Sequence, residues 1–282
     1  MSARKGSTGP RTRLTPLGWI VVVAVVVLPG SVVARWAIDG GPARDASPAV
    51  TTVPGDGSGA SAGPGSSPRI AGNAVAGLPA CVDDDLPAED ADPDDWARTI
   101  LDTAHELPAG YAPPDLESVD EAGFDRDLKV RAEVVDDLAA LREAAADAGH
   151  PIDVVAAYRS FTLQDDLFRR RSAHLGYAVA ITHTARPGHS EHQLGTAIDF
   201  KTLGAPTVSS NWGATPAGLW MALNAYRFGF VLSYPEGATD RTCYAFEPWH
   251  YRYFGRTLAG RIHASGLTAR EFLWREAHPS GA

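Results

Sequence analysis

The sequence has little basic charge and no glycine-rich phosphate-binding motif. It contains 25 Lys and Arg against 34 Asp and Glu, which gives a net charge of −9. Four of the basic residues stand before residue 20 with no acid among them, so the rest of the chain is more acidic still. Such a chain offers no broad basic surface, and no nucleic acid is expected as a partner. The glycine-rich stretch at 55–67 has no strand before it and no G-K-[ST], so it is no phosphate loop.

One uncharged and mostly apolar run, residues 18–34, follows the basic start. Its length is at the short end for a membrane span, and the basic flank predicts that the N-terminus stays in the cytoplasm while the rest is exported. Two interpretations stay open: a retained anchor, or a signal cleaved after the V-V-A at 32–34. We therefore divide the chain into a basic tail with anchor or signal at 1–38, a flexible Gly/Ser/Pro/Ala linker at 39–79 and one folded domain at 80–282.

Cysteine is scarce, with only Cys81 and Cys243. Both stand in the exported part, where disulfides persist, and no third cysteine competes. A disulfide between them is therefore predicted, two separate buried thiols being the alternative. Closing so long a loop would contribute on the order of 4–5 kcal/mol in the chain-entropy model.

The order of predicted elements is typical of an α+β domain. Apolar periodicity predicts helices at 93–104 (with Asp92 as its N-cap), 130–148, 161–173 and 217–226. Short strands are predicted at 152–157, 196–200, 230–234 and 249–254. Helices come first and strands dominate later, which indicates a small antiparallel sheet with helices packed on it rather than alternating βαβ units.

Two short motifs carry the chemistry: S-E-H-Q-L-G-T-A-I-D at 190–199 and E-P-W-H at 247–250. They supply His192, Asp199 and His250, and two imidazoles with one carboxylate are a usual ligand set for a catalytic zinc. Glu247 stands three residues before His250 and is a candidate base for a zinc-activated water. A turn at Gly195 would bring His192 back towards Asp199.

Each of these residues also has a structural interpretation when it is taken alone. Asp199 would be a buried carboxylate satisfied by backbone amides, and His250 a hydrogen-bonded core histidine. The joint occurrence of both motifs favours the metal site. His189 lies three residues before His192, but a site of this type needs only three protein ligands, so His189 is expected to stay outside it.

The pattern S-x-H-x-x-G-x-A-x-D followed by E-P-W-H resembles the VanY-type D-alanyl-D-alanine carboxypeptidases. These zinc peptidases are related to lysostaphin-like enzymes and to the hedgehog domain. The Y-R-S-F at 158–161 with Gln164 resembles a third motif of the family, and R-P-G-H at 186–189 leads into the first. The resemblance covers about residues 81–275.

The resemblance implies one Zn2+ per chain, in a cleft of the sheet, held by His192, Asp199 and His250. Glu247 would be the general base, and Arg159 would stabilise the oxyanion or hold substrate. The residues implied as substrate contacts are Ser190, Gln164, Tyr158 and Trp249. The implied reaction removes the terminal D-alanine of a peptidoglycan stem peptide. An L,D-carboxypeptidase and a wall endopeptidase are alternatives with the same chemistry.

Two rival classes remain. The segment 188–192 has the frame of a serine nucleophile elbow, but histidine replaces its closing glycine. The motif S-x-x-K occurs only at residues 2–5, and K-T-L at 201–203 is not K-T-G. The second rival is a zinc-holding module that binds the cell wall without cutting it. The presence of both Glu247 and Arg159 favours an enzyme.

Overall fold

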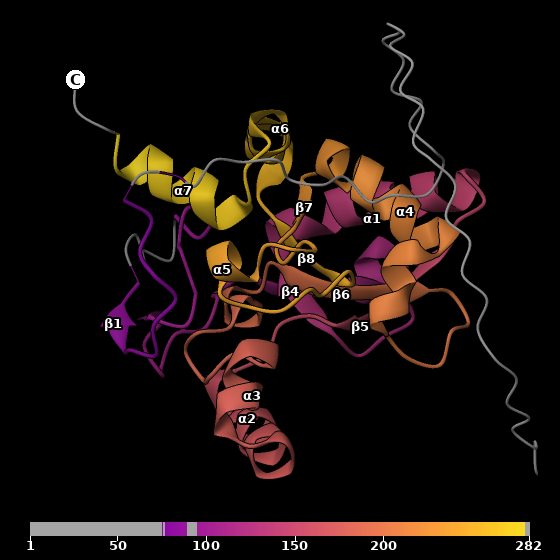
Figure 1. Ribbon diagram of the computed structural model, residues 1–282. Helices are drawn as coiled ribbons and strands as arrows, with labels where there is room; N and C mark the ends of the chain where they lie inside the picture. The colour runs from indigo at the N-terminus through magenta and orange to yellow at the C-terminus, as the bar shows by residue number, and fades with distance from the viewer. Residues whose placement is uncertain (1–74, 76, 89–94, 280–282) are drawn as a thin grey trace, which may run out of the picture. The chain divides into compact units, whose positions relative to one another are not determined.

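The computed structural model describes residues 75, 77–88 and 95–279 (Figure 1). The predicted tail with anchor or signal, nearly all of the linker, and Asp92 lie outside these residues. Within them, no helix is both long and apolar enough to cross a membrane.

A four-stranded antiparallel sheet forms the centre of the domain, with strand order β5-β6-β8-β7. These strands are β5 Ile152–Ala156, β6 Ala197–Thr202, β8 His250–Tyr253 and β7 Phe230–Leu232. All four predicted strands are present, with ends that shift by at most two residues. In the β6–β8 register Asp199 lies directly opposite His250, so pairing alone brings two predicted ligands together.

The helices of the described part are α1 Ala132–Asp147, α2 Phe161–Leu175, α3 Tyr177–His183, α4 Pro216–Asn224, α5 Thr239–Thr242, α6 Gly255–Ser265 and α7 Ala269–Ala277. Two small strand pairs precede α1: β1 Leu86–Pro87 with β2 His105–Glu106, and β3 Leu116–Ser118 with β4 Lys129–Arg131. Short 3-10 helices complete the order: η1 Val119–Ala122, η2 Glu191–Leu194, η3 Ser210–Ala214 and η4 Ala225–Phe228. The predicted α+β class is confirmed.

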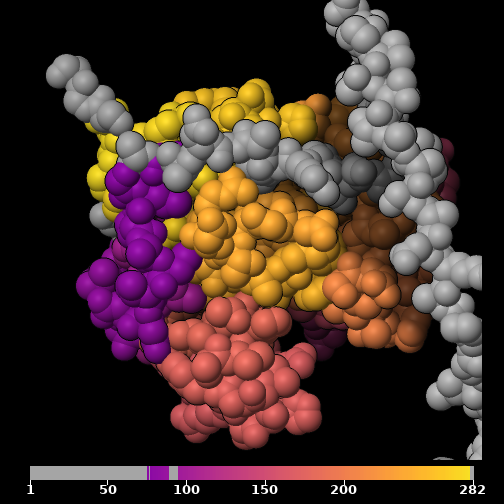
Figure 2. Space-filling view, viewed as in Figure 1, coloured from indigo at the N-terminus to yellow at the C-terminus, as the bar shows by residue number. Residues whose placement is uncertain are grey.

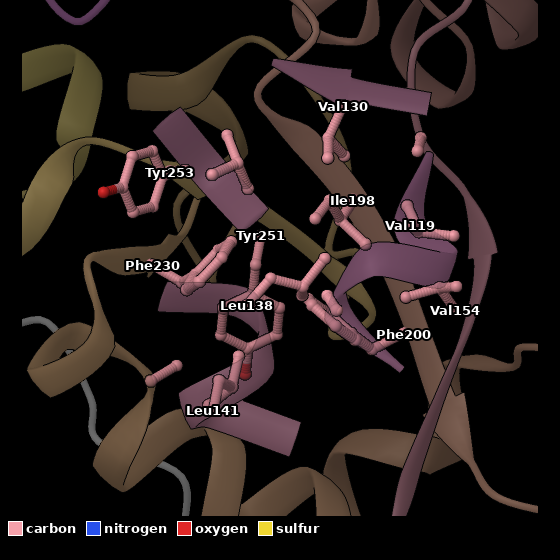
Figure 3. Close-up of a cluster of buried hydrophobic side chains, with 14 of the residues drawn as sticks. Val119, Val130, Leu138, Leu141, Val154, Ile198, Phe200, Phe230, Tyr251 and Tyr253 are labelled. Carbon is pink, nitrogen blue, oxygen red and sulfur yellow. The ribbon is translucent and has the colours of Figure 1, made fainter. Parts of the chain in front are cut away.

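One face of the sheet packs on α1, as Figure 3 shows for Leu138 and Leu141 beside Phe200 and Tyr251. All four side chains are buried. Burying each large apolar side chain contributes about 1.5–3 kcal/mol. Because side chains alternate along a strand, this packing turns Asp199, the neighbour of Phe200, towards the opposite face.

The prediction of a helix over 93–104 is wrong for residues 95–104, the part of this range that the structure describes. From Asp95 to Ala104 the chain forms a turn and bends, and β2 begins at His105. The Asp102 carboxylate accepts hydrogen bonds from the backbone N–H groups of Ala104 (2.8 Å) and His105 (2.9 Å). Such a side-chain bond competes with helix formation. Trp96 and Leu101 still reach the core, so the apolar spacing reflects burial in irregular chain.

The predicted disulfide between Cys81 and Cys243 is present, with the two Cα atoms 5.1 Å apart. It joins the segment before β1 to the end of α5, across a sequence separation of 162 residues. The bond thus fastens the start of the described domain close to the E-P-W-H motif.

Candidate metal and catalytic site

The three predicted metal ligands come together on the face of the sheet opposite α1. His192 lies in η2, Asp199 on β6 and His250 at the start of β8. Their candidate ligand atoms all lie within 4.8 Å of one another. The Asp199 carboxylate is 3.1 Å from Nδ1 of His250 and 3.5 Å from Nε2 of His192. The arrangement provides two nitrogen donors and one oxygen donor around one centre.

Local turns produce this convergence. The 3-10 helix that carries His192 ends at Gly195, whose φ of 75° is a left-handed conformation that glycine adopts without strain. A Cβ at Gly195 would also approach Pro113 to 3.0 Å. The predicted turn at Gly195 is confirmed.

Each histidine is oriented by a hydrogen bond at the ring nitrogen that faces away from the centre. Nδ1 of His192 donates to the carbonyl oxygen of Ala157 (2.7 Å), which leaves Nε2 directed at Asp199. Nε2 of His250 bonds the carboxylate of Glu191 (2.9 Å), which leaves Nδ1 facing Asp199. Carbonyl and carboxylate partners of this kind fix the ring and raise its basicity as a metal ligand.

Glu191 is a site residue that the motif analysis missed. Its carboxylate also accepts hydrogen bonds from Ser233 (2.6 Å) and Arg252 (3.1 Å), and it is 6 % exposed. Burial alone raises the pKa of a carboxyl group, but the bonds from His250, Arg252 and Ser233 outweigh it and hold the pKa of Glu191 below its usual value. The only signal in the sequence is its place immediately before His192.

The two histidines have opposite electrostatic environments. Burial and the positive charge of Arg159 lower the pKa of His192, which favours the neutral form of the ring that binds a metal. Burial also disfavours the charge on His250, but the carboxylates of Asp199 and Glu191 overcome this and raise its pKa. A metal that binds at His250 must therefore displace a proton. The donor set, with both outer nitrogens fixed, fits a zinc ion.

Glu247 lies beside the ligands without joining the group. Residues 248–249 form a turn, closed by the His250 N–H bonding the Glu247 carbonyl (3.0 Å), so β8 begins at His250 rather than at 249. The turn places Glu247 Oε2 3.9 Å from Nδ1 of His250. Burial raises the pKa of Glu247 to about 7; the charge of Asp199 adds to this and that of His250 opposes it. A carboxyl with such a pKa can both accept and donate a proton near neutrality.

Arg159 and Gln164 form a unit at the same cavity. A terminal nitrogen of the Arg159 guanidinium donates to Oε1 of Gln164 (2.7 Å), and Nε2 of Gln164 donates to the carbonyl of Ala185 (2.6 Å). The Arg159 backbone N–H bonds the carbonyl of His192 (3.1 Å). Burial lowers the pKa of Arg159, which the charges of Asp199 and Glu247 oppose. Gln164 thus positions the Arg159 guanidinium at the cavity.

A cavity of about 220 Å³ opens over these groups. Among the predicted substrate contacts, Ser190, Gln164 and Trp249 line it, whereas Tyr158 is not among its lining residues. Tyr158 instead bonds through its backbone N–H to the carbonyl of Lys129 (2.8 Å). The other walls come from α2, from the end of α3 and the residues after it, and from Val208, Tyr234 and Tyr244. Figure 2 shows α2 and α3, in salmon, beside the orange surface of the segment around residues 235–250.

His189 lies outside the ligand group, as predicted, and belongs to a second cluster. Its Nδ1 donates to the Asp102 carbonyl (2.8 Å), and its Nε2 is 3.3 Å from Asp85 and 3.6 Å from Glu106. These three side chains also bring their ligand-type atoms within 4.8 Å. The guanidinium of Arg186 forms an ion pair with the same Asp85 oxygen, so this cluster already contains a cation.

The fold and the His–Asp–His group with a carboxylate beside it define a zinc peptidase type of site. The family model "VanY: D-alanyl-D-alanine carboxypeptidase" matches residues 127–256. A D-alanyl-D-alanine carboxypeptidase of Enterococcus faecalis is 33% identical over 195 residues, which cover 66% of this chain and 68% of that protein. The chain belongs to the VanY D-alanyl-D-alanine carboxypeptidase family, and it is therefore a zinc carboxypeptidase by class.

Two solved structures extend the comparison. One is the structure of the LdcB LD-carboxypeptidase, which is 33% identical to this chain with a TM-score of 0.58. The match covers 62% of this chain and 84% of the LdcB chain. The other is a mutant of the vancomycin-resistance D,D-pentapeptidase VanY in complex with Zn(II), which is 30% identical with a TM-score of 0.55. The match covers 63% of this chain and 99% of the VanY chain. Relatives that act at different bonds therefore share this fold.

Proposed function

We propose that this protein is a zinc-dependent D-alanyl-D-alanine carboxypeptidase that trims the terminal D-alanine from peptidoglycan stem peptides. The observation that carries the proposal is the convergence of His192, Asp199 and His250, with Glu247 and Arg159 at the same cavity. Zinc held by the three ligands would polarise the scissile carbonyl and acidify a water molecule.

The protein groups divide the remaining work. Glu247 takes the proton of the attacking water and delivers it to the departing D-alanine amine, which its pKa of about 7 suits. Arg159, held by Gln164, binds the carbonyl oxygen or the terminal carboxylate through its planar guanidinium. Glu191 keeps His250 oriented throughout.

A second candidate is an L,D-carboxypeptidase, which the likeness to LdcB at 33% identity supports. Both reactions would use the same ligands and base, and the difference would arise from the cavity walls. Val208, from the loop between β6 and η3, lines the cavity, so this loop is a candidate for setting which peptide bond enters.

The test is to incubate the purified zinc-loaded chain with two stem peptides and to identify the products by mass spectrometry. One peptide is a pentapeptide ending in D-Ala-D-Ala, and the other is the matching tetrapeptide ending in a single D-alanine. Loss of one alanine from the pentapeptide alone supports the D,D activity, and loss from the tetrapeptide alone supports the L,D activity. A product that retains both alanines, or turnover that survives removal of zinc with a chelator, contradicts the proposal.

We also propose that the enzyme acts outside the membrane, either anchored there or secreted after cleavage of the N-terminal segment. The basic start, the apolar run at 18–34 and the linker support this location. The disulfide between Cys81 and Cys243 is a bond expected in an oxidising compartment. Cell fractionation with an antibody to the domain tests it, and the size of the product distinguishes an anchor from a cleaved signal.

A further inference from the structure

One face of α2 forms a wall of the catalytic cavity. Its residues Gln164, Leu167 and Arg171, spaced by three and four positions, all line that cavity. This spacing places them on one side of a helix. Figure 1 shows α2 and α3 extending together away from the sheet, so the wall leads outward from the zinc ligands. Gln164, at the inner end, holds Arg159.

Arg171, at the outer end of this wall, is a cation with no carboxylate partner among the described residues. Two residues earlier, Arg169 pairs with Asp165 at 2.6 Å on the same helix. The acidic residues that line the cavity are Asp199 and Glu247, both at the zinc end. The cavity thus presents one guanidinium near the ligands and a second one at its mouth.

We propose that Arg171 forms an anion subsite that binds a free carboxylate of the substrate on the N-terminal side of the scissile bond. Seven residues of helix separate it from Gln164, which corresponds to about 10 Å along the axis. An extended peptide covers that distance in about three residues. A departing D-alanine extends only one residue beyond the scissile bond, so its carboxylate does not reach Arg171.

The substrate class follows from this spacing. It is a peptide with a free carboxylate two or three residues before the bond that is cut. A glutamate joined to the next residue through its γ-carboxyl has this chemistry, since its α-carboxylate remains ionised. The inference rests on the proposed carboxypeptidase function and adds to it a preference for the acid over the amidated form of the stem.

Two synthetic pentapeptides test the inference. Both end in L-Lys-D-Ala-D-Ala, and they differ only in a γ-linked D-glutamate or its α-amide, D-isoglutamine. Steady-state kinetics are measured for the wild-type zinc enzyme, for Arg171→Gln and for the control Arg170→Gln. Arg170 is exposed, as Arg171 is, but it does not line the cavity. Arginine and glutamine have similar helix propensity, so both variants should keep α2 intact.

We expect the wild type and Arg170→Gln to have a KM about two- to fivefold lower for the acid than for the amide. Added salt should reduce this difference. Arg171→Gln should raise the KM for the acid to that for the amide, so that the preference is lost. The subsite is overturned if Arg171→Gln keeps the preference or if the wild type has none. An equal loss of kcat on both peptides in Arg171→Gln would also overturn it. Release of no D-alanine from either peptide by the wild type overturns the proposed function itself, and this inference with it.

Discussion

His189 and His192 stand three residues apart in one segment, yet they enter clusters of opposite electrostatic character. Around His192, the carboxylates of Asp199 and Glu247 approach each other closely enough to contribute to the raised pKa of Glu247. Around His189, the hydrogen bond and charge of Arg186 lower the pKa of Asp85. The first cluster has negative charge that a divalent cation would compensate, and the second obtains its cation from the protein.

Ligand-type atoms at suitable distances therefore do not by themselves make a metal site. Both clusters bring a histidine and carboxylate oxygens within 4.8 Å. His189 is also oriented by a partner, the Asp102 carbonyl, but the first cluster has two imidazoles and a further carboxylate, Glu247, at a cavity. We therefore expect one zinc per chain, bound by the first cluster.

Glu247→Gln should retain zinc but lower kcat about 10²–10⁴-fold, because the amide cannot take a proton from water. Zinc content by metal analysis and peptide turnover are measured on the same preparation. The matched control is Glu236→Gln, an exposed glutamate outside the catalytic cavity. Normal turnover in Glu247→Gln would remove Glu247 from the chemistry and contradict its role as the general base.

Replacing Cys81 and Cys243 together with serine should lower the free energy of unfolding by about 2–5 kcal/mol. The bond lies near Asp85 and the second cluster, so proteolysis within residues 77–88 should accelerate. Zinc affinity should change little, because the ligands are held by β6, β8 and η2. Denaturant unfolding and chelator competition measure the two effects, and a loss of zinc in the folded variant would contradict the separation of the clusters.

Glu191→Gln should weaken zinc binding about 10–100-fold, because a neutral partner makes the His250 ring less basic. Ser233→Ala is the control, since it removes one hydrogen bond to the same carboxylate without changing the charge. Its effect should be smaller. Chelator competition at constant pH gives both affinities, and equal values for Glu191→Gln and the wild type would show that His250 does not need this partner.

His189→Ala should lower the free energy of unfolding by about 1–3 kcal/mol, because the Asp102 carbonyl loses a buried hydrogen bond. Zinc content should stay at one per chain. In His192→Ala the zinc should be lost. A lower zinc content in His189→Ala would show that the second cluster also binds metal.

Local patterns predicted most of the sheet and of the helices α1, α2 and α4. They failed at 95–104, where Asp102 bonds backbone N–H groups and Trp96 and Leu101 are buried from irregular chain. Periodicity reports which residues are buried, and burial does not require a regular helix. The small helices α3 and α5 and the C-terminal helices α6 and α7 were not among the predicted elements.

The donors could be named from the two motifs, because each motif fixes its own residue types and spacing: His192 with Asp199, and Glu247 with His250. The sequence also predicted the disulfide, since two exported cysteines allow one pairing, and the structure confirms it. The tertiary structure decided what depends on contacts between distant segments. Pairing of β6 with β8 sets Asp199 opposite His250, Glu191 reaches His250 across 59 residues, and Arg186 gives the second cluster its cation. Such contacts form only when the chain folds, so no local pattern encodes them.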